Sequence, residues 1–265
     1  MAPPGSLKMG PLTNCVIAPK YAILIIINMV VSAIPPFIME VYYLGVALNW
    51  NPLGLSSVQF LLDISTILHP WMQFGSWLLF PFNLLAFFYL YAFCSIKISK
   101  FFLFFEKKLH PPKEGIFPRD FSNNDFYHWH ARRAIKKFPC WLLKLVPFTW
   151  MKMKYIHNQL GAKIGNEVGL LDSWIDLEFV TIEDGVAIGR GAAVTSHFFT
   201  SEALIIKRVH VKKDAIIGER VRITPGSIIG EKSTILIRST LALGTDVPDG
   251  AIFKGNPAKP VERTS

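Results

Sequence analysis

Three polar side chains interrupt an otherwise regular aliphatic pattern in the C-terminal half of the chain. Asp176 occupies a position that the pattern reserves for an aliphatic residue, and Glu178 follows two residues later. His197 stands at the start of a stretch, 194–208, in which the pattern is lost. A histidine ordinarily titrates close to neutral pH, so it can take a proton there. A carboxylate inside a core is costly unless it is paired or lies at a cleft. Asp176 therefore either takes part in chemistry or turns outward from an irregular first turn of the fold.

The interrupted pattern is an aliphatic residue at every sixth position. All but one of thirteen such positions are aliphatic, the exception being Asp176. The positions are Ile164, Leu170, Asp176, Ile182, Ile188, Val194, then Val211, Ile217, Ile223, Ile229, Ile235, Leu241 and Val247. A period of six predicts a parallel β-helix, in which three hexapeptides form one triangular coil with the aliphatic side chains inside. Val194 and Val211 are 17 positions apart, one short of three repeats. We therefore expect a loop to leave the coil there, with His197 at its start.

The elements that must position this coil begin with two uncharged apolar runs. Residues 21–39 and 77–96 are each long enough to cross a hydrocarbon core of roughly 30 Å, and we interpret both as transmembrane helices. Pro35 and Pro36 are expected to kink or end the first. The alternative for the first run is a cleaved signal peptide, since VSA at 31–33 resembles a cleavage site. The long preceding stretch and the second run favour the membrane helix.

Lysine and arginine predict the orientation of these helices. Hydrophobic residues make up 51% of the chain and the mean hydropathy is +0.34. Between Lys20 and Lys97 there is no basic residue, whereas residues 97–163 hold 14 basic and 4 acidic residues, a net charge of +10. The positive-inside rule then places both termini and the coil in the cytoplasm, with the loop from Asn49 to Ser76 outside.

The basic segment, 97–160, alternates lysine and arginine with aromatic clusters. Arg132, Arg133, Lys136 and Lys137 lie among them. We interpret the segment as amphipathic helices in the membrane interface, in contact with lipid and broken at Pro139 and Pro147. Binding of nucleic acid would use similar residues, but two preceding spans place this segment at a membrane.

Metal binding is not indicated by the cysteines or histidines. Cys15, Cys94 and Cys140 are scattered, and no CxxC spacing occurs. His128 and His130 lie two positions apart, which puts them on different faces of a helix. We therefore expect no metal and no disulfide framework.

The repeat and the C-terminal end carry a family resemblance. The chain resembles the hexapeptide-repeat acyltransferases, which fold as left-handed β-helices and end in a signature similar to DVPDGAIFKGNPAKPVER at 246–263. More narrowly, it is similar to the membrane-bound C-terminal region of epsilon-poly-lysine synthetases. That resemblance rests on LGAKIG at 160–165, WIDLEFVTIEDG at 174–185 and SHFF at 196–199. It covers most of residues 97–263, most closely after residue 160.

The resemblance implies a function and roles for six residues. It implies a homotrimer with sites between the adjacent β-helices of neighbouring subunits, and a histidine on the loop, His197, as general base. Asp176 or Glu178 would orient this histidine or bind an acceptor amine. Ser239, Lys254 and Asn256, taken as outward-facing or as part of the C-terminal signature, would meet coenzyme A.

The sequence thus predicts two transmembrane helices within 1–96, basic interfacial helices over 97–160 and a left-handed β-helix over 161–265. The predicted activity is transfer of an acyl group, most simply acetyl, from acetyl-CoA to an amine or hydroxyl of a small-molecule or lipid-linked acceptor. Zinc-dependent hydration is disfavoured because no H-x₄-H spacing is present. Two alternatives remain: an aminoacyl or peptidyl transferase that uses a carrier-bound thioester, and a trimeric membrane scaffold without catalysis.

Overall fold

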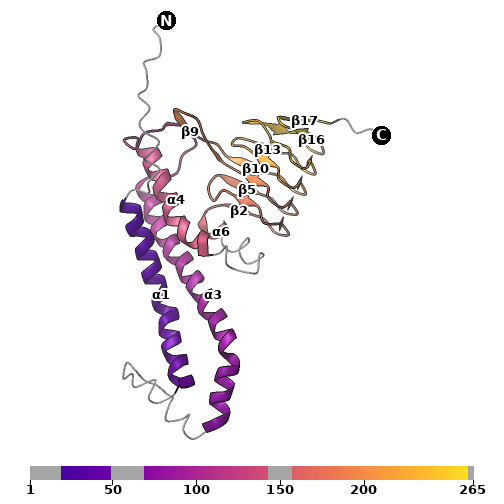
Figure 1. The fold of residues 1–265 in the computed structure, drawn as a ribbon. Coiled ribbons are helices and arrows are strands. Elements are labelled where there is room, and N and C mark those ends of the chain that lie inside the picture. Colours follow the sequence, from indigo (N-terminus) through magenta and orange to yellow (C-terminus); the bar gives the residue numbers. More distant parts are fainter. Residues whose placement is uncertain (1–18, 49–68, 143–156, 262–265) are drawn as a thin grey trace.

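The computed structural model describes residues 19–48, 69–142 and 157–261 (Figure 1). Two long helices lie side by side, and a coil of short strands projects from one end of this pair. A third helix, α4, lies between the pair and the coil. The fold therefore joins an apolar helical part to a strand-rich part, as the sequence predicts.

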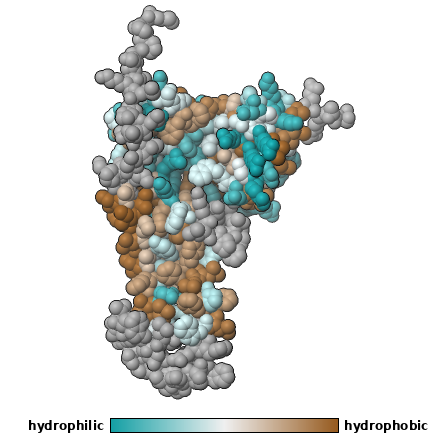
Figure 2. Space-filling model, in the orientation of Figure 1, coloured by the Kyte–Doolittle hydropathy of each residue, from teal (hydrophilic) through white to brown (hydrophobic). Residues whose placement is uncertain are grey.

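The two long helices are α1 (Pro19–Leu48) and α3 (His69–Leu109). Residues 22–45 and 77–109 within them are long and apolar enough to cross a membrane. Figure 2 shows apolar side chains over these helices and more polar ones over the coil. Both helices are longer than predicted, because α1 continues past Pro35 and Pro36 and α3 continues into the basic segment. A proline removes only one donor, and packing between neighbouring helices tolerates it.

The basic segment differs from a set of helices lying on a membrane. After α3 come the strand β1 (Gly115–Pro118), the helix α4 (Asn124–Leu142) and the short helix α6 (His157–Leu160). The predicted break at Pro139 is wrong, since α4 runs on to Leu142, and Pro147 lies outside the described residues. Arg132 and Lys136 are buried rather than turned to lipid. Ion pairing makes this burial possible, as described below.

The coil has three faces, each a parallel sheet. One face holds β2 (Lys163–Ile164), β5 (Val180–Ile182), β10 (Val209–Val211), β13 (Ile228–Ile229) and β15 (Asp246–Val247). The second holds β3 (Gly169–Leu170), β6 (Ala187–Ile188), β11 (Ile216–Ile217), β14 (Thr234–Ile235), β16 (Ile252–Gly255) and the antiparallel end strand β17 (Ala258–Pro260). The third holds β4 (Trp174–Ile175), β7 (Ala193–Val194) and β12 (Arg222–Ile223).

Inward aliphatic side chains stack along each face. On the first face Ile182 aligns with Val211, and Val211 with Ile229. All twelve predicted aliphatic positions are buried and belong to one core. Each such side chain contributes about 1.5–3 kcal/mol by leaving water, so the stack is the main source of stability of the coil.

The prediction that Asp176 occupies an inward position of the repeat is wrong by one residue. Ile175, not Asp176, aligns with Val194 and fills the core, so the spacing from Leu170 is five residues there instead of six. Asp176 follows at the corner, where its N–H donates to the carbonyl of Val194 at 3.0 Å. The first coil is thus irregular, and this irregularity moves the carboxylate of Asp176 out of the aliphatic stack.

The second irregularity is an antiparallel hairpin that leaves the coil after β7. Its strands are β8 (His197–Phe199) and β9 (Ala203–Ile206), and β9 also pairs with β1 from the segment before α4. Leu204 and Ile206 of the hairpin are buried in a cluster with Phe126 and Trp129 of α4. This packing fixes α4 over the start of the hairpin, where His197 stands.

Candidate active site

The hairpin and the irregular first coil bring His197 and Asp176 together. Nδ1 of His197 lies 2.5 Å from Oδ2 of Asp176. Both side chains are largely buried, with 16% and 10% of their surfaces exposed. The residues are 21 positions apart but stand at the same corner on adjacent coils, because the backbone at Asp176 pairs with that at Val194. The coil geometry therefore builds a histidine–carboxylate pair.

Further donors hold Asp176 in its ionised form. Oδ2 accepts the backbone N–H of Ser196 at 2.9 Å, and Oδ1 accepts the indole N–H of Trp174 at 3.2 Å. Burial opposes ionisation, but the hydrogen bond and charge of His197 and the N–H of Ser196 outweigh it, so the pKa of Asp176 lies below its usual range. A fixed carboxylate of this kind sets the orientation and the tautomer of the imidazole.

Helix α4 supplies the other side of the site. Nη1 of Arg133 lies 3.2 Å from Nε2 of His197. A guanidinium has only donors, so Nε2 is the acceptor of this bond and Nδ1 carries the hydrogen that His197 donates to Asp176. The guanidinium stacks over Trp129 at 4.7 Å, and the rings of Trp129 and His197 are 5.1 Å apart. His197 thus presents a basic nitrogen beside an aromatic surface.

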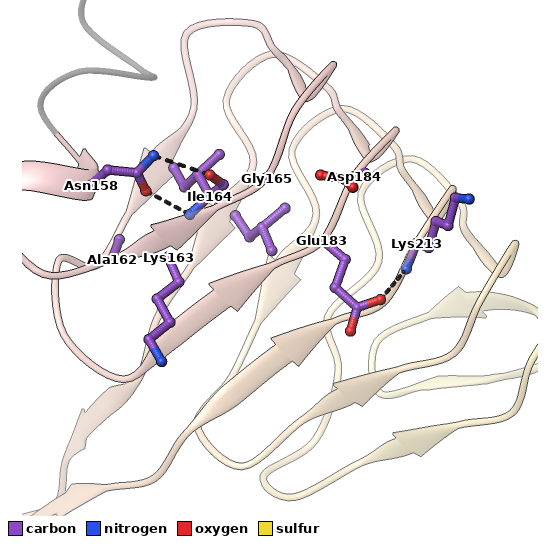
Figure 3. Close-up of a pocket in the computed structure, with 9 residues that line it drawn as sticks. Asn158, Ala162, Lys163, Ile164, Gly165, Glu183, Asp184 and Lys213 are labelled. Carbon is purple, nitrogen blue, oxygen red and sulfur yellow. Dashed lines mark hydrogen bonds between the residues drawn. The ribbon is translucent and has the colours of Figure 1, made fainter.

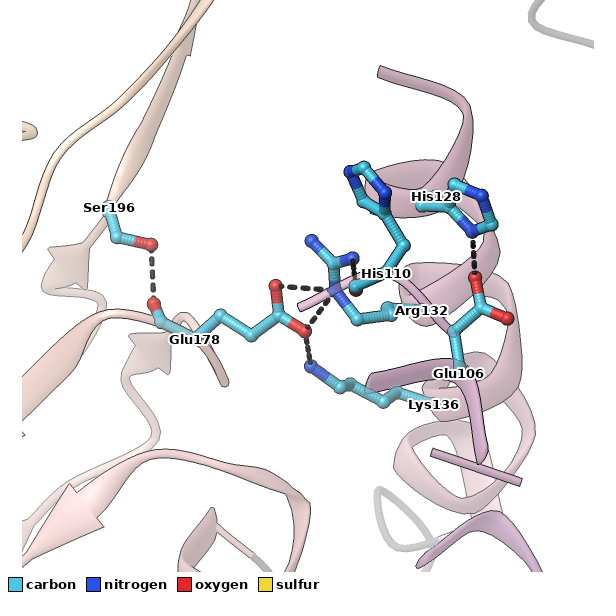
Figure 4. Close-up of polar contacts among 7 residues, drawn as sticks. All are labelled: Glu106, His110, His128, Arg132, Lys136, Glu178 and Ser196. Carbon is cyan, nitrogen blue, oxygen red and sulfur yellow. Dashed lines mark hydrogen bonds and ion pairs between the residues drawn. The ribbon is translucent and has the colours of Figure 1, made fainter. Parts of the chain in front are cut away.

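Glu178 does not reach His197 but closes a separate buried cluster (Figure 4). Its carboxylate lies 2.6 Å from Nζ of Lys136 and 3.1 Å from Nε of Arg132. Burial opposes ionisation, but these two cations outweigh it and lower the pKa of Glu178. Its backbone carbonyl also accepts the hydroxyl of Ser196 at 2.6 Å. Glu178 therefore ties α4 to the coil immediately beside the histidine–aspartate pair.

The residues predicted to meet coenzyme A lie elsewhere. The prediction that Ser239 faces outward is wrong, because its side chain is fully buried and its hydroxyl accepts the N–H of Gly255 at 3.1 Å. A small side chain is needed at this tight corner of the coil. Lys254 and Asn256 are exposed, at the far end of the coil around the turn between β16 and β17.

A hollow of about 500 Å³ opens at the other end of the coil (Figure 3). Asn158 spans one side of it, donating to the carbonyl of Ile164 and accepting from its N–H. Glu183 and Lys213 line the opposite side. His197 does not line this hollow. Asn158 in the lining supplies hydrogen bonds to the backbone at the open edge of the first coil. In the described ranges no three metal-ligating side chains come together.

Sequence reasoning missed the contribution of α4 to the site. Arg133 and His197 are 64 residues apart, and no periodicity links the two segments. The available signal was the mixture of arginine and tryptophan in 124–142, which also fits an interfacial helix. The packing of Trp129 against the hairpin and the burial of Arg132 and Lys136 distinguish the two interpretations.

Comparison with protein-family models gives no match. Among curated proteins, the delta-poly-L-ornithine synthetase of Acinetobacter baumannii is 27% identical over 137 residues, which is 51% of this chain. The match spans only 10% of that synthetase, so the chain corresponds to about a tenth of its length.

Solved structures with some likeness include a hexapeptide-repeat acetyltransferase of Vibrio cholerae in complex with acetyl coenzyme A. It is 17% identical, with 54% of this chain and 91% of that one covered and a TM-score of 0.44. A maltose O-acetyltransferase of Clostridium difficile is 20% identical, with 49% and 84% covered and a TM-score of 0.40. The name of the synthetase agrees with the narrower resemblance stated from the sequence.

Proposed function

We propose that the chain is an acyltransferase anchored in a membrane by α1 and α3. It moves an acyl group, most simply acetyl, from a coenzyme A thioester to an amine or hydroxyl acceptor. The observation that carries this proposal is the 2.5 Å contact between His197 and Asp176, which leaves Nε2 of His197 as the proton acceptor. The acetyltransferase names of the similar structures agree with it.

The chemistry uses His197 twice. Nε2 takes the proton from the amine or hydroxyl of the acceptor. At the same time the nitrogen or oxygen of the acceptor bonds to the carbonyl carbon of the thioester. The carbon–sulfur bond then breaks, and the same proton passes from His197 to the departing thiolate. Asp176 stabilises the imidazolium in between, because its carboxylate accepts the hydrogen on Nδ1. No net proton is gained or lost by the protein.

The membrane anchor and the assembly belong to the same proposal. Large apolar side chains such as Phe82 and Phe37 are exposed on the two long helices, which suits contact with lipid. Lys97, Lys100 and Lys107 lie towards the end of α3, which favours a cytoplasmic coil. We further propose that the β-helix is left-handed and that the chain forms a homotrimer. Lys254 and Asn256 would then meet coenzyme A between the β-helices of neighbouring subunits.

A second candidate is transfer of an aminoacyl or peptidyl group from a carrier-bound thioester. The similarity to a poly-L-ornithine synthetase favours it. The two candidates differ in the donor: free acetyl-CoA protects the purified protein against thermal unfolding in the first and not in the second. The proton transfers at His197 are the same in both.

The test of acyl transfer uses the full chain in detergent. Thiol release from acetyl-CoA is followed with panels of amines and alcohols, for the wild type, His197→Ala and His210→Ala. His210 is the matched control, a half-buried coil histidine whose Nε2 lies 2.6 Å from Glu183. We expect His197→Ala to lower turnover by about 10²–10⁴-fold and His210→Ala to stay close to wild type. Equal rates in all three proteins, no higher than the rate without protein, would instead support a scaffold without catalysis. Equal rates above that level would exclude His197 as the base.

A further inference from the structure

Arg133 covers the atom that the proposed reaction needs. Its Nη1 donates to Nε2 of His197 at 3.2 Å, which is where an acceptor must place its own N–H or O–H. The acceptor therefore replaces Arg133 at this nitrogen, and the guanidinium stays within a few ångströms of the reacting group. An anionic group next to the nucleophile of the acceptor would therefore lie close to the guanidinium of Arg133.

Arg133 differs from the cations on either side of the same helix. Arg132 and Lys136 are buried and share Glu178, whereas Arg133 is exposed and forms no ion pair within the described part of the chain. Its guanidinium lies over the face of Trp129 at 4.7 Å. Stacking fixes the plane of the group while leaving donors free, and such a planar fork matches the two oxygens of a carboxylate or phosphate.

A second arginine adds positive charge to the same place. Arg119 lies over the ring of Phe199 at 5.7 Å, and Phe199 is 5.5 Å from Trp129. Burial, the charges of Arg133 and Arg119, and His197 lower the pKa of the neighbouring His130 to about 4. The charges of both arginines thus reach His130, which stays neutral at physiological pH.

From this arrangement we propose that Arg133 binds an anionic group, a carboxylate or phosphate, on the acceptor while His197 takes the proton from its amine or hydroxyl. The inference rests on the proposed acyl transfer and specifies the substrate class of that site. Arg119 adds to the attraction without touching the nucleophile. Glu178 is a positioning residue, because its contacts with Arg132 and Lys136 hold the turn of α4 that carries Arg133.

The experiment compares acceptors that differ only in the anionic group. L-ornithine is paired with 1,4-diaminobutane, and O-phosphoethanolamine with ethanolamine, using the full chain in detergent and acetyl-CoA as donor. We expect wild type to favour an anionic member by at least about tenfold in kcat/KM. Arg133→Met should remove this preference by raising the KM of the anionic acceptor, and Arg133→Lys should restore part of it.

The control variant is Lys137→Met, which removes another exposed cation one turn further along α4 and should keep the preference. A donor arm compares acetyl-CoA with acetyl-CoA lacking the 3′-phosphate. If Arg133→Met changes only the KM of the phosphate-bearing donor, Arg133 serves the donor and the inference is overturned.

Two further outcomes separate the inference from the function on which it rests. Transfer that shows no preference for anionic acceptors, in wild type and Arg133→Met alike, overturns the role of Arg133 and leaves acyl transfer standing. Absence of transfer from the thioester to every acceptor, in a folded wild type, counts against acyl transfer and removes the basis of the inference as well.

Discussion

Asp176 and Glu178 are only two residues apart, and both are buried carboxylates that contact cationic or ionisable side chains. Glu178 meets two buried cations and neutralises one of them inside the fold. Asp176 meets a single histidine whose other nitrogen faces an exposed arginine. The difference lies in the surroundings of their partners: the cations that contact Glu178 are buried, whereas Nε2 of His197 faces an exposed arginine. We therefore interpret Glu178 as the carboxylate that ties α4 to the coil, and Asp176 as the one that orients the proposed general base.

The largest expected effect in this comparison belongs to Glu178. Glu178→Gln leaves Arg132 and Lys136 buried without a counter-charge, so we expect the free energy of unfolding to fall by about 3–5 kcal/mol. Denaturation of the purified full chain measures it. Glu183→Gln is the matched control, because Glu183 is a coil carboxylate with 42% of its side chain exposed and should cost less than about 1 kcal/mol. Similar losses in both variants would show that α4 is not held by Glu178.

Asp176→Asn should act on catalysis more than on folding. The amide cannot replace both acceptor oxygens, so His197 loses the partner that fixes the hydrogen on Nδ1. We expect kcat to fall by about 10²-fold, with a smaller loss of stability than in Glu178→Gln. Thiol-release kinetics and denaturation on the same preparations separate the two effects. A fall of kcat by less than about threefold would remove Asp176 from the mechanism.

The sequence predicts the coil well because each inward position is decided locally. An aliphatic residue every six positions needs only its counterparts on adjacent coils, such as Ile182 with Val211. The helical segments are also visible from composition alone. Their ends were misplaced because a charge or a proline marks the edge of an apolar run and not the end of hydrogen bonding, as Pro139 inside α4 shows.

The site was predicted in part, for a related reason. His197 and Asp176 both break a strict pattern, so the sequence singles them out without showing that they touch. The assignment of Asp176 to the core failed because a five-residue step to Ile175 is compensated later in the coil. Arg133 follows no pattern, since its place depends on packing of Trp129 against a distant hairpin. Contacts between segments that share no period need the structure.

The smallest expected effect concerns Arg119 and Arg133, which pair with no carboxylate within the described part of the chain. Burial, Arg133, Arg119 and His197 lower the pKa of His130 to about 4 in the folded chain, against about 6.5 when unfolded. The unfolded chain therefore binds more protons between these pH values, and stability rises with pH through this window. The contribution is complete above about pH 6.5 and is lost as the pH falls towards about 4.

His130→Gln should flatten this dependence by roughly 1 kcal/mol between about pH 4.5 and about pH 6.5, a value discounted because the ring is only partly buried. Denaturation of the full chain at the two pH values measures it. Arg119→Met should flatten the dependence in part, because one of the two arginine charges that oppose protonation of His130 is removed. If neither variant changes the dependence of stability on pH, Arg133 and Arg119 are neutralised in solution. The contrast between the paired cations at Glu178 and the unpaired ones near His197 then fails.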